Sequence, residues 1–263
     1  MGKKDKKDKG KQAEKKAKKD LKQQKSANKR AKKEKDDDEE DIESIINAFQ
    51  AKESAKTAVS ITLCDPPSPR ANASMTVLPS GDLLMFGGEF CDGAKTEVFN
   101  DLYRWNIDKN EWKKIESLNT PPPRCSHQAV AFRDKMYVFG GEYGTLDQFH
   151  HYRDMWSLDL KTSVWTELKP AGDCPSARSG HRMLVYRNYI VMFGGFYEAM
   201  REVKWFNELH LFSLQEERWI VVPPKPNSQI PRCRSAALLC VYPADESLYV
   251  YGGFSKEKMA NAR

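Results

Sequence analysis

The chain has 263 residues, with 43 Lys and Arg against 37 Asp and Glu, which gives a formal net charge of +6. At roughly 150 residues per domain, this length allows one large domain or two small ones. The sequence has no run of about 18 apolar residues and no apolar stretch after its charged start, so neither a transmembrane helix nor a secretory signal peptide is expected.

The positive charge is concentrated in an N-terminal tail. Residues 1–35 contain 17 Lys and Arg against 5 acids, seven of residues 36–43 are acidic, and residues 44–263 are nearly neutral. A segment without aromatic side chains cannot bury enough surface to fold alone. Residues 1–41 are therefore predicted to be a low-complexity tail, disordered or transiently helical. Residues 1–35 are interpreted as a nuclear or nucleolar address or a contact with RNA or a ribonucleoprotein, with a solubilising arm as the alternative.

Residues 42–57 are predicted to form a short amphipathic helix and a linker. The i, i+3, i+4, i+7 spacing of one helix face is met by Ile42, Ile45, Ile46 and Phe49. We expect this face to pack on its own chain or, as the less favoured alternative, on a partner.

The six cysteines contain no C-x-x-C pair. In a chain without an export signal, thiols stay reduced, so free cysteines are expected instead of a disulfide framework or a zinc knuckle. The protein is therefore expected inside the cell, in the nucleus, the cytoplasm or both. Neither secretion nor membrane binding is expected.

Residues 58–263 contain an internal repeat of about 54 residues. An arginine recurs at steps of 54, a Gly-Gly pair follows an apolar run four times, and a tryptophan recurs after 53 and 54 residues. An Asp or Glu before a hydrophobic residue keeps the same period. The residues predicted to be structural on this basis are Arg70, Gly87, Gly88, Trp112, Arg124, His127, Gly140, Gly141, Trp165, Arg178, His181, Gly194, Gly195, Trp219, Arg232, Gly252 and Gly253.

These markers resemble the kelch repeat, in which a glycine pair ends an apolar strand and a tryptophan follows about 25 residues later. The resemblance implies an all-β fold, a kelch-type β-propeller made of four-stranded blades. Three repeats are complete and the fourth stops after its Gly-Gly pair, so three full blades and half of a fourth are expected. The order of tail, helix and repeats is also similar to one eukaryotic group of kelch domain-containing proteins, whose members are about twice this long.

Three further expectations concern the ring. The three repeat tryptophans are expected to fill the wedges between neighbouring blades. Residues 58–63 occupy the slot of an outer strand, which in a closed ring completes the last blade. Since that blade is missing, the chain is interpreted as an N-terminal fragment, a truncated gene product or a splice form. A stable open array, or a dimer that closes the ring, is the alternative.

The repeat histidines are expected to be structural. His127 and His181 lie three residues after their arginines, and the same position in the first and fourth copies is assigned to Ala73 and Ser235. A metal or catalytic role shared by the ring is therefore not expected.

The loops after the Gly-Gly pairs, about 89–99, 142–152 and 196–206, are the predicted binding surface. They recur in place but not in sequence, as binding loops on a rigid scaffold do. Aromatic and charged side chains make good anchors for a protein contact. The candidate partner-binding residues are Glu89, Phe90, Glu142, Tyr143, His150, Phe196, Tyr197, Arg201 and Trp205. Structural roles are expected for Phe99, Tyr152 and Phe206.

The favoured function is a non-enzymatic scaffold that binds other proteins through these loops. No motif supplies a catalytic residue, and the adjacent His150 and His151 diverge in an extended chain, so no metal, cofactor or small-molecule substrate is expected. The alternative is an RNA- or ribonucleoprotein-associated factor bound mainly through the basic tail. An enzyme is least favoured: kelch-propeller copper oxidases are secreted, and no matching Cys, Tyr and His set recurs here.

Overall fold

The structure is a computed structural model of the whole chain, and it describes residues 44–47, 49, 59–145, 149–199 and 202–256. The chain divides into two units, residues 1–55 and 56–263. In the first unit, residues 44–47 and 49 are helical, and Ile45, Ile46 and Phe49 are exposed. The predicted tail, residues 1–41, lies outside the described residues, so the packing of the helix remains a prediction.

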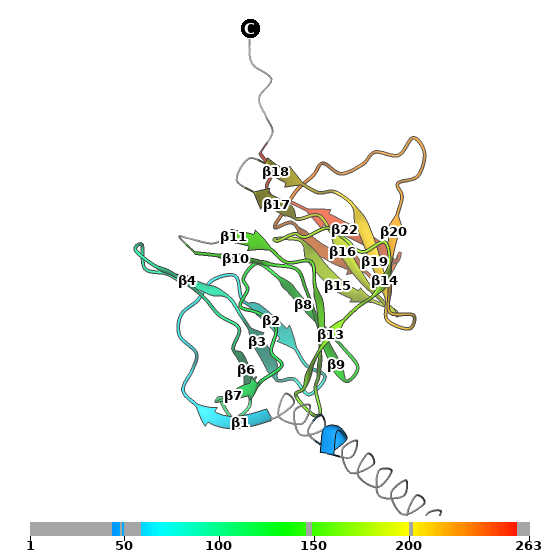
Figure 1. Cartoon of the computed structure of the whole chain (residues 1–263). Helices are drawn as coiled ribbons and strands as arrows, with labels where there is room; N and C mark the ends of the chain where they lie inside the picture. Colours follow the sequence, from blue (N-terminus) through cyan, green and yellow to red (C-terminus); the bar gives the residue numbers. More distant parts are fainter. Residues whose placement is uncertain (1–43, 48, 50–58, 146–148, 200–201, 257–263) are drawn as a thin grey trace, which may run out of the picture. The chain divides into compact units, whose positions relative to one another are not determined.

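The second unit is built of antiparallel β-sheets, which confirms the all-β kelch-type fold (Figure 1). Blade one consists of β2 (Ser74–Val77), β3 (Leu83–Phe86), β6 (Leu102–Asn106) and β7 (Glu111–Ser117). Blade two consists of β8 (Gln128–Phe132), β9 (Lys135–Phe139), β12 (Met155–Asp159) and β13 (Trp165–Leu168). Blade three consists of β15 (Arg182–Tyr186), β16 (Tyr189–Phe193), β19 (Leu209–Ser213) and β20 (Arg218–Val222). Half of a fourth blade follows as the hairpin of β21 (Leu238–Tyr242) and β22 (Ser247–Tyr251). The propeller is not closed.

Two further strands extend the blades. A short β14 (Ala171–Gly172) runs parallel to β20. The expected outer strand at residues 58–63 forms as β1 (Val59–Cys64), but it pairs antiparallel with β7 of blade one. In this open array the strand therefore lies on blade one, and its place in a closed ring stays a prediction. The physical reason is that β7 would otherwise present an unpaired edge, and β1 covers it.

The arginine of each complete repeat ties its blade together. In blade two, the buried Arg124 donates to the Gly140 carbonyl at 3.0 Å and to both carboxylate oxygens of Asp154 at 2.8 Å. Its guanidinium lies 4.1 Å from the centre of the Tyr152 ring. Burial raises the pKa of Asp154, but the hydrogen bonds and charge of Arg124 outweigh it and hold that pKa below its ordinary value.

The same arrangement recurs on either side of blade two. Arg70 and Arg178 donate to the carbonyls of their glycine pairs and to an acid, and each stacks on an aromatic ring. The residues bound in this way are Gly87, Asp101 and Phe99 in blade one, and Gly194, Glu208 and Phe206 in blade three. Phe99, Tyr152 and Phe206 therefore lie over the arginines.

In the fourth copy, the repeat arginine is Arg234 and not Arg232, which corrects the sequence assignment. Arg234 donates to the Gly252 carbonyl at 2.8 Å, as Arg124 does to Gly140. Its neighbour Ser235 forms the bridge to Phe254 that Ser179 forms to Phe196 in blade three. The residue three positions after Arg234 is Ala237, so Ala237, and not Ser235, stands at the histidine position.

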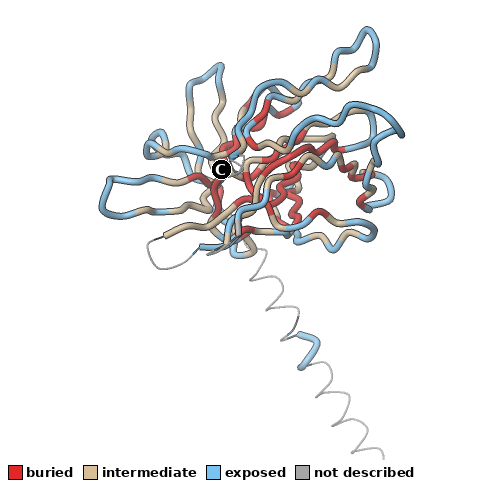
Figure 2. The backbone as a smooth tube through the Cα atoms, turned by 90° about the horizontal axis from the view of Figure 1, so that it is seen from above, coloured by how far each residue is buried: buried red, intermediate tan, exposed pale blue. Residues whose placement is uncertain are grey.

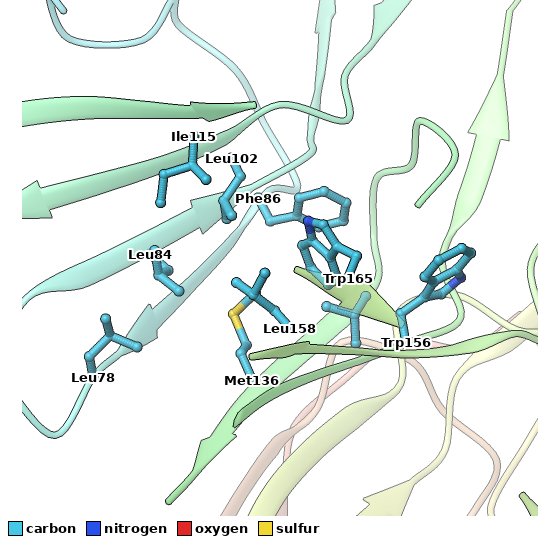
Figure 3. Close-up of a cluster of buried hydrophobic side chains, with 10 residues drawn as sticks. Leu78, Leu84, Phe86, Leu102, Ile115, Met136, Trp156, Leu158 and Trp165 are labelled. Carbon is cyan, nitrogen blue, oxygen red and sulfur yellow. The ribbon is translucent and has the colours of Figure 1, made fainter. Parts of the chain in front are cut away.

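Two apolar seams join the three blades. The buried residues gather in the interior of the second unit (Figure 2). In the first seam, Trp165 of blade two packs on Phe86 of blade one, with 5.0 Å between ring centres (Figure 3). In the second seam, Trp219 of blade three packs on Phe139 of blade two at 5.2 Å. Both tryptophans are almost completely buried, so they fill the seams as expected.

Trp112 does not fill a seam, which corrects the expectation for the first repeat. It is half-buried and stacks on Trp105 of the same blade, with ring centres 5.3 Å apart. The tryptophan of a blade packs on the blade before it, and the described residues place no blade before blade one.

Backbone contacts reinforce the seams. The Gly141 N–H donates to the Arg178 carbonyl of the next blade at 2.9 Å. Gly140 has a φ of 65°, and a Cβ there would lie 2.6 Å from the same carbonyl. Only glycine tolerates both the left-handed backbone and this close approach.

The repeat histidines are buried within the seams. His127 Nε2 lies 2.9 Å from Ser74 Oγ of blade one, and its ring meets Phe86 edge-on. His181 meets Phe139 in the same way. Burial lowers the pKa of His127 to about 3 and holds that of His181 well below its ordinary value, so both rings are neutral at physiological pH.

Candidate functional site

The segments after the first three Gly-Gly pairs each form a β-hairpin, where the sequence predicted a loop. The hairpins are β4 (Glu89–Cys91) with β5 (Thr96–Val98), β10 (Glu142–Gly144) with β11 (Phe149–His151), and β17 (Phe196–Ala199) with β18 (Glu202–Trp205). They lie at the same end of the three blades (Figure 1). We call the surface formed by these three hairpins the hairpin face.

An aromatic row crosses the hairpin face from blade two to the fourth copy. On hairpin two, the His151 ring meets Phe149 and Phe196 edge-on, with ring centres 5.0 and 5.3 Å apart. Phe196 stacks on Trp205 at 5.3 Å, and Trp205 meets Phe254 edge-on at 5.3 Å. Two predicted residues, Phe196 and Trp205, lie in this row. Tyr143 and His150 form a separate stacked pair on the second hairpin, with ring centres 5.6 Å apart.

The remaining candidates are spread along the same face. Phe90 is 44 % exposed in the first hairpin, and His150 is exposed in the second. Tyr197 is half-buried, with its ring centre 5.1 Å from that of His151. Arg201 lies outside the described residues.

Three glutamates add negative charge to the hairpin face. Glu89 accepts a hydrogen bond from Asn72 Nδ2 at 2.7 Å, and Glu142 and Glu198 lie on the next two hairpins. Burial raises the pKa of Glu142 above its ordinary value, and the charges of Glu89 and Glu198 act in the same direction. Hydrogen bonds from Ser126 and Ser179 oppose this rise. A cation placed beside Glu142 would lower its pKa again.

A serine, a histidine and an acid meet at the base of the hairpin face. His151 Nδ1 lies 2.5 Å from Ser179 Oγ and 3.7 Å from a Glu142 carboxylate oxygen. The Glu198 backbone N–H donates to His151 Nε2 at 2.8 Å, so the ring proton is on Nδ1 and is donated to Ser179. To act as a general base on Ser179, the His151 ring would have to turn its unprotonated nitrogen toward the serine. That nitrogen is Nε2, and it accepts the Glu198 N–H instead. Burial also lowers the pKa of His151 to about 4. The His151 side chain of hairpin two therefore has a structural role, because its bond to the Glu198 N–H joins it to hairpin three.

Sequence reasoning missed three residues of this face. Phe149 is 47 % exposed, Phe254 is 58 % exposed, and Glu198 joins the acidic group. Phe254 had a usable signal, because it follows its glycine pair as Phe196 does. Glu198 is a charged residue of the predicted loop 196–206, but its approach to Glu142 depends on how the hairpins pack and could not be read from the sequence.

Within the described part of the chain, no group of three or more His, Cys, Asp or Glu side chains is arranged to hold a metal ion. The same residues contain no helix long and apolar enough to cross a membrane. All six cysteines are free thiols.

Comparison with known proteins identifies the family. A family model described as the KLHDC2/KLHL20/DRC7 Kelch-repeats domain matches residues 35–253. Kelch domain-containing protein 10 of Homo sapiens is 30% identical over 203 residues, which cover 72% of this chain and 42% of that protein. The leucine-zipper-like transcriptional regulator 1 homolog of Drosophila melanogaster is 31% identical over 164 residues, which cover 59% of this chain and 16% of that protein. The flagellar outer arm dynein alpha chain of Chlamydomonas reinhardtii is 29% identical over 205 residues, which cover 73% of this chain and 4% of that protein.

The chain therefore belongs to the kelch-repeat family. Kelch-repeat homologues indicate a protein-interaction module, and proteins of this family are generally non-enzymatic scaffolds. The chain spans less than half the length of the relatives named above. The closer similarity to one eukaryotic group of kelch domain-containing proteins stays a prediction.

Proposed function

We propose that this chain is a protein-interaction scaffold whose hairpin face binds a partner protein inside the cell. The observation that carries the proposal is the aromatic row from His151 through Phe196 and Trp205 to Phe254, with the stacked pair of Tyr143 and His150 on the second hairpin. Stacked, half-buried aromatic rings lose little conformational entropy when a partner covers them, and aromatic residues dominate protein contacts.

The blades support this face rigidly. Arginines beneath the hairpins, such as Arg124 and Arg178, fix the backbone from which β10 and β17 start. Rigid presentation reduces the ordering cost of binding. The glutamates beside the row favour a partner segment that carries basic groups, because its charge would offset the clustered carboxylates.

The test is proximity labelling with the full chain and two matched variants in cells. In the first variant, Phe90 and Tyr143 are replaced by alanine, which removes two rings of the hairpin face. In the control, Tyr189→Ala removes a partly exposed tyrosine at the opposite end of β16. We expect the first variant to lose most specific neighbours and the control to keep them. An unchanged set of neighbours in the first variant would contradict the proposal.

A second candidate function is association with RNA or a ribonucleoprotein through residues 1–35. The observation that favours it is the excess of 17 basic over 5 acidic residues there. Phosphate contacts release counterions, so binding of this kind weakens steeply as salt rises. A chain lacking residues 1–35 should lose RNA binding if the tail carries it. RNA binding that persists in the shortened chain would refute this role of the tail.

A further inference from the structure

A polar pocket of about 290 Å³ lies between blade one and a turn of blade two. Blade one supplies most of its wall from β6 and β7, and blade two supplies the buried Ser163 from the turn between β12 and β13. Asp82, which precedes β3, also lines the pocket, whereas the first hairpin follows the far end of β3. The pocket therefore lies at the opposite end of blade one from the hairpin face. We call it the polar pocket.

Two cations face each other across neighbouring strands in the wall of the polar pocket. Arg104 of β6 pairs directly with Lys113 of β7, and both line the pocket. Like charges directly opposite each other on antiparallel strands destabilise a sheet. Arg104 Nε donates to an Asp82 carboxylate oxygen at 2.7 Å, so one of the two charges is offset. Among the residues that the structure describes, the Lys113 side chain has no ion-pair partner.

The other blades show that the fold does not require this pair. The second member of each equivalent pair comes one residue after the repeat tryptophan. Blade two has Ser157 opposite Thr166 at this place, and blade three has Leu211 opposite Ile220. Both pairs are uncharged. A local cost that the repeat itself does not impose indicates a functional site, where proteins commonly break such rules.

The two acids of the polar pocket differ in what they contact. Both Asp82 carboxylate oxygens are engaged, because Arg104 donates to one and Asn106 Nδ2 donates to the other at 2.8 Å. Glu111 lies directly opposite Asn106 on β7 and lines the pocket without an ion-pair partner in the described part of the chain. Glu111 is therefore the carboxylate that remains available to a ligand.

The remaining charges favour an anion. Lys109 and Lys113 both line the polar pocket and are exposed, and no ion pair of the described residues involves either side chain. Two ammonium groups therefore stand against the single available carboxylate of Glu111. A phosphate ester carries nearly two negative charges at neutral pH, and lysine and arginine are its usual partners in proteins. The volume is near the lower limit for ligand pockets, which suits a small molecule.

We propose that the polar pocket binds the phosphate group of a small organic phosphate. Lys109 and Lys113 donate to the phosphate oxygens, and the N–H groups of Arg104 that Asp82 leaves free add to this contact. Glu111 accepts a hydrogen bond from a hydroxyl group of the same molecule, so a hydroxylated phosphate ester binds better than free phosphate. This site goes beyond the proposed scaffold function, since it shares neither place nor chemistry with the hairpin face.

Isothermal titration calorimetry of the full chain tests the proposal. Glycerol phosphate is the probe, because it combines a phosphate ester with hydroxyl groups, and inorganic phosphate and acetate are the comparisons. We expect saturable binding of glycerol phosphate, weaker binding of inorganic phosphate and no saturable binding of acetate. The ionic strength is held constant, so that changes in the screening of the basic residues 1–35 do not contribute.

Two adjacent lysines on β7 give a matched pair of chain variants. Lys113 lines the polar pocket, whereas Lys114 points to the other face of the strand and forms an ion pair with Glu116 at 2.9 Å. Lys113→Thr copies the residue of blade two and should weaken binding of glycerol phosphate by a factor of about 10 or more. Lys114→Thr should change it by no more than about twofold. Circular dichroism verifies that each variant is folded.

Urea unfolding gives a second measurement. Without phosphate, Lys113→Thr should not lower the unfolding midpoint, because it removes the repulsion with Arg104. Added glycerol phosphate should raise the midpoint of the unchanged chain and of Lys114→Thr, since a ligand of the native state stabilises it. The midpoint of Lys113→Thr should not rise.

Four outcomes would overturn the proposal. One is the absence of saturable binding of glycerol phosphate, and a second is acetate binding of equal affinity. A third is equal weakening of binding by Lys113→Thr and Lys114→Thr, which would mean that the phosphate responds to the overall charge of the chain instead of the polar pocket. The fourth is a rise of the unfolding midpoint with glycerol phosphate that is as large for Lys113→Thr as for the unchanged chain.

Discussion

The second seam and the apolar groove between blade three and the β21–β22 hairpin, which we call the third seam, both have a phenylalanine in the wall, Phe139 and Phe193. Within the described residues, only the second seam is filled by a tryptophan. Both are bridged by backbone hydrogen bonds of equal length: Gly141 N–H to the Arg178 carbonyl, and Gly195 N–H to the Arg234 carbonyl, at 2.9 Å each. Only the second contains a tryptophan, Trp219. The glycine and arginine motif therefore joins neighbouring repeats without help from the outer strands, whereas the apolar filling depends on them.

The repeat arginines show the same difference. Arg124 is completely buried between Asp154 and Tyr152. Arg234 keeps its bond to the Gly252 carbonyl, but that bond is exposed. The acid and the aromatic ring come from the segment that leads into the third strand, so a half blade provides only the first part of the motif.

The largest effect is expected from Trp219→Ala. Deleting a fully buried indole leaves a cavity in the second seam, which should lower the free energy of unfolding by about 3–5 kcal/mol. Trp112→Ala is the control, since that ring is half-buried at the free end of the array and should cost less than about 1.5 kcal/mol. Urea unfolding followed by circular dichroism measures both. Equal losses would mean that a tryptophan inside a seam contributes no more to the free energy of unfolding than one outside it.

A somewhat smaller effect is expected from Arg124→Met. The change leaves the Asp154 carboxylate without its partner, and breaking a buried pair costs about 3 kcal/mol. Arg234→Met removes two exposed hydrogen bonds, to the Arg232 and Gly252 carbonyls, and should cost about 1 kcal/mol. The same urea titration compares the two variants, and a larger loss for Arg234→Met would reverse the proposed ranking.

Acidification should weaken the filled seams before the third seam. Burial lowers the pKa of His127 to about 3 and keeps that of His181 well below normal, while an unfolded histidine titrates near about 6.5. The unfolded chain therefore binds more protons below that value. The stability from each neutral histidine is fully present above about pH 6.5 and is lost progressively as the pH falls, toward about pH 3 for His127, by at most about 1.4 kcal/mol per pH unit.

Alanine variants test this pH dependence. Ala73 and Ala237 stand at the histidine position in the first and fourth copies, so alanine is compatible with the fold there. Urea unfolding at about pH 7 and pH 5 should show a smaller difference for the chain with His127→Ala and His181→Ala than for the unchanged chain. An identical difference in both chains would assign the acid sensitivity to other groups.

The smallest effect is expected from Gly252→Ala. Gly252 has a φ of 66° but no atom within 4 Å of an added Cβ, so only the left-handed backbone is penalised, by about 1 kcal/mol. Gly140→Ala adds a clash with the Arg178 carbonyl and should cost clearly more in the same unfolding assay. Similar losses would show that the next blade does not restrict Gly140.

Much of the fold could be predicted because its markers are local in the chain. The glycine pairs, Arg124 and Trp219 act within a repeat or toward a neighbouring one, so their spacing reveals them. Arg232 was assigned wrongly because a constant step of 54 residues was assumed. The connection from Trp219 to Arg234 is two residues longer than that from Trp165 to Arg178, and a loop absorbs such an insertion without disturbing the blades.

The pairing of β1 and the hairpin face depended on geometry that the sequence does not encode locally. β1 pairs with whichever outer strand is available, and only the structure shows that this is β7. In the hairpin face, the residue types were recognisable, but their meeting depends on strand register. His151 illustrates this, because its ring is buried between two hairpins while the adjacent His150 is exposed.

Hydrogen exchange of the backbone amides in the full chain tests the difference between the seams most directly. We predict slow exchange throughout β9 and β16, which are paired on both edges, and fast exchange at those β22 amides that do not bond to β21. Exchange throughout β22 as slow as in β16 would show that its edge is already covered, and would contradict the open third seam.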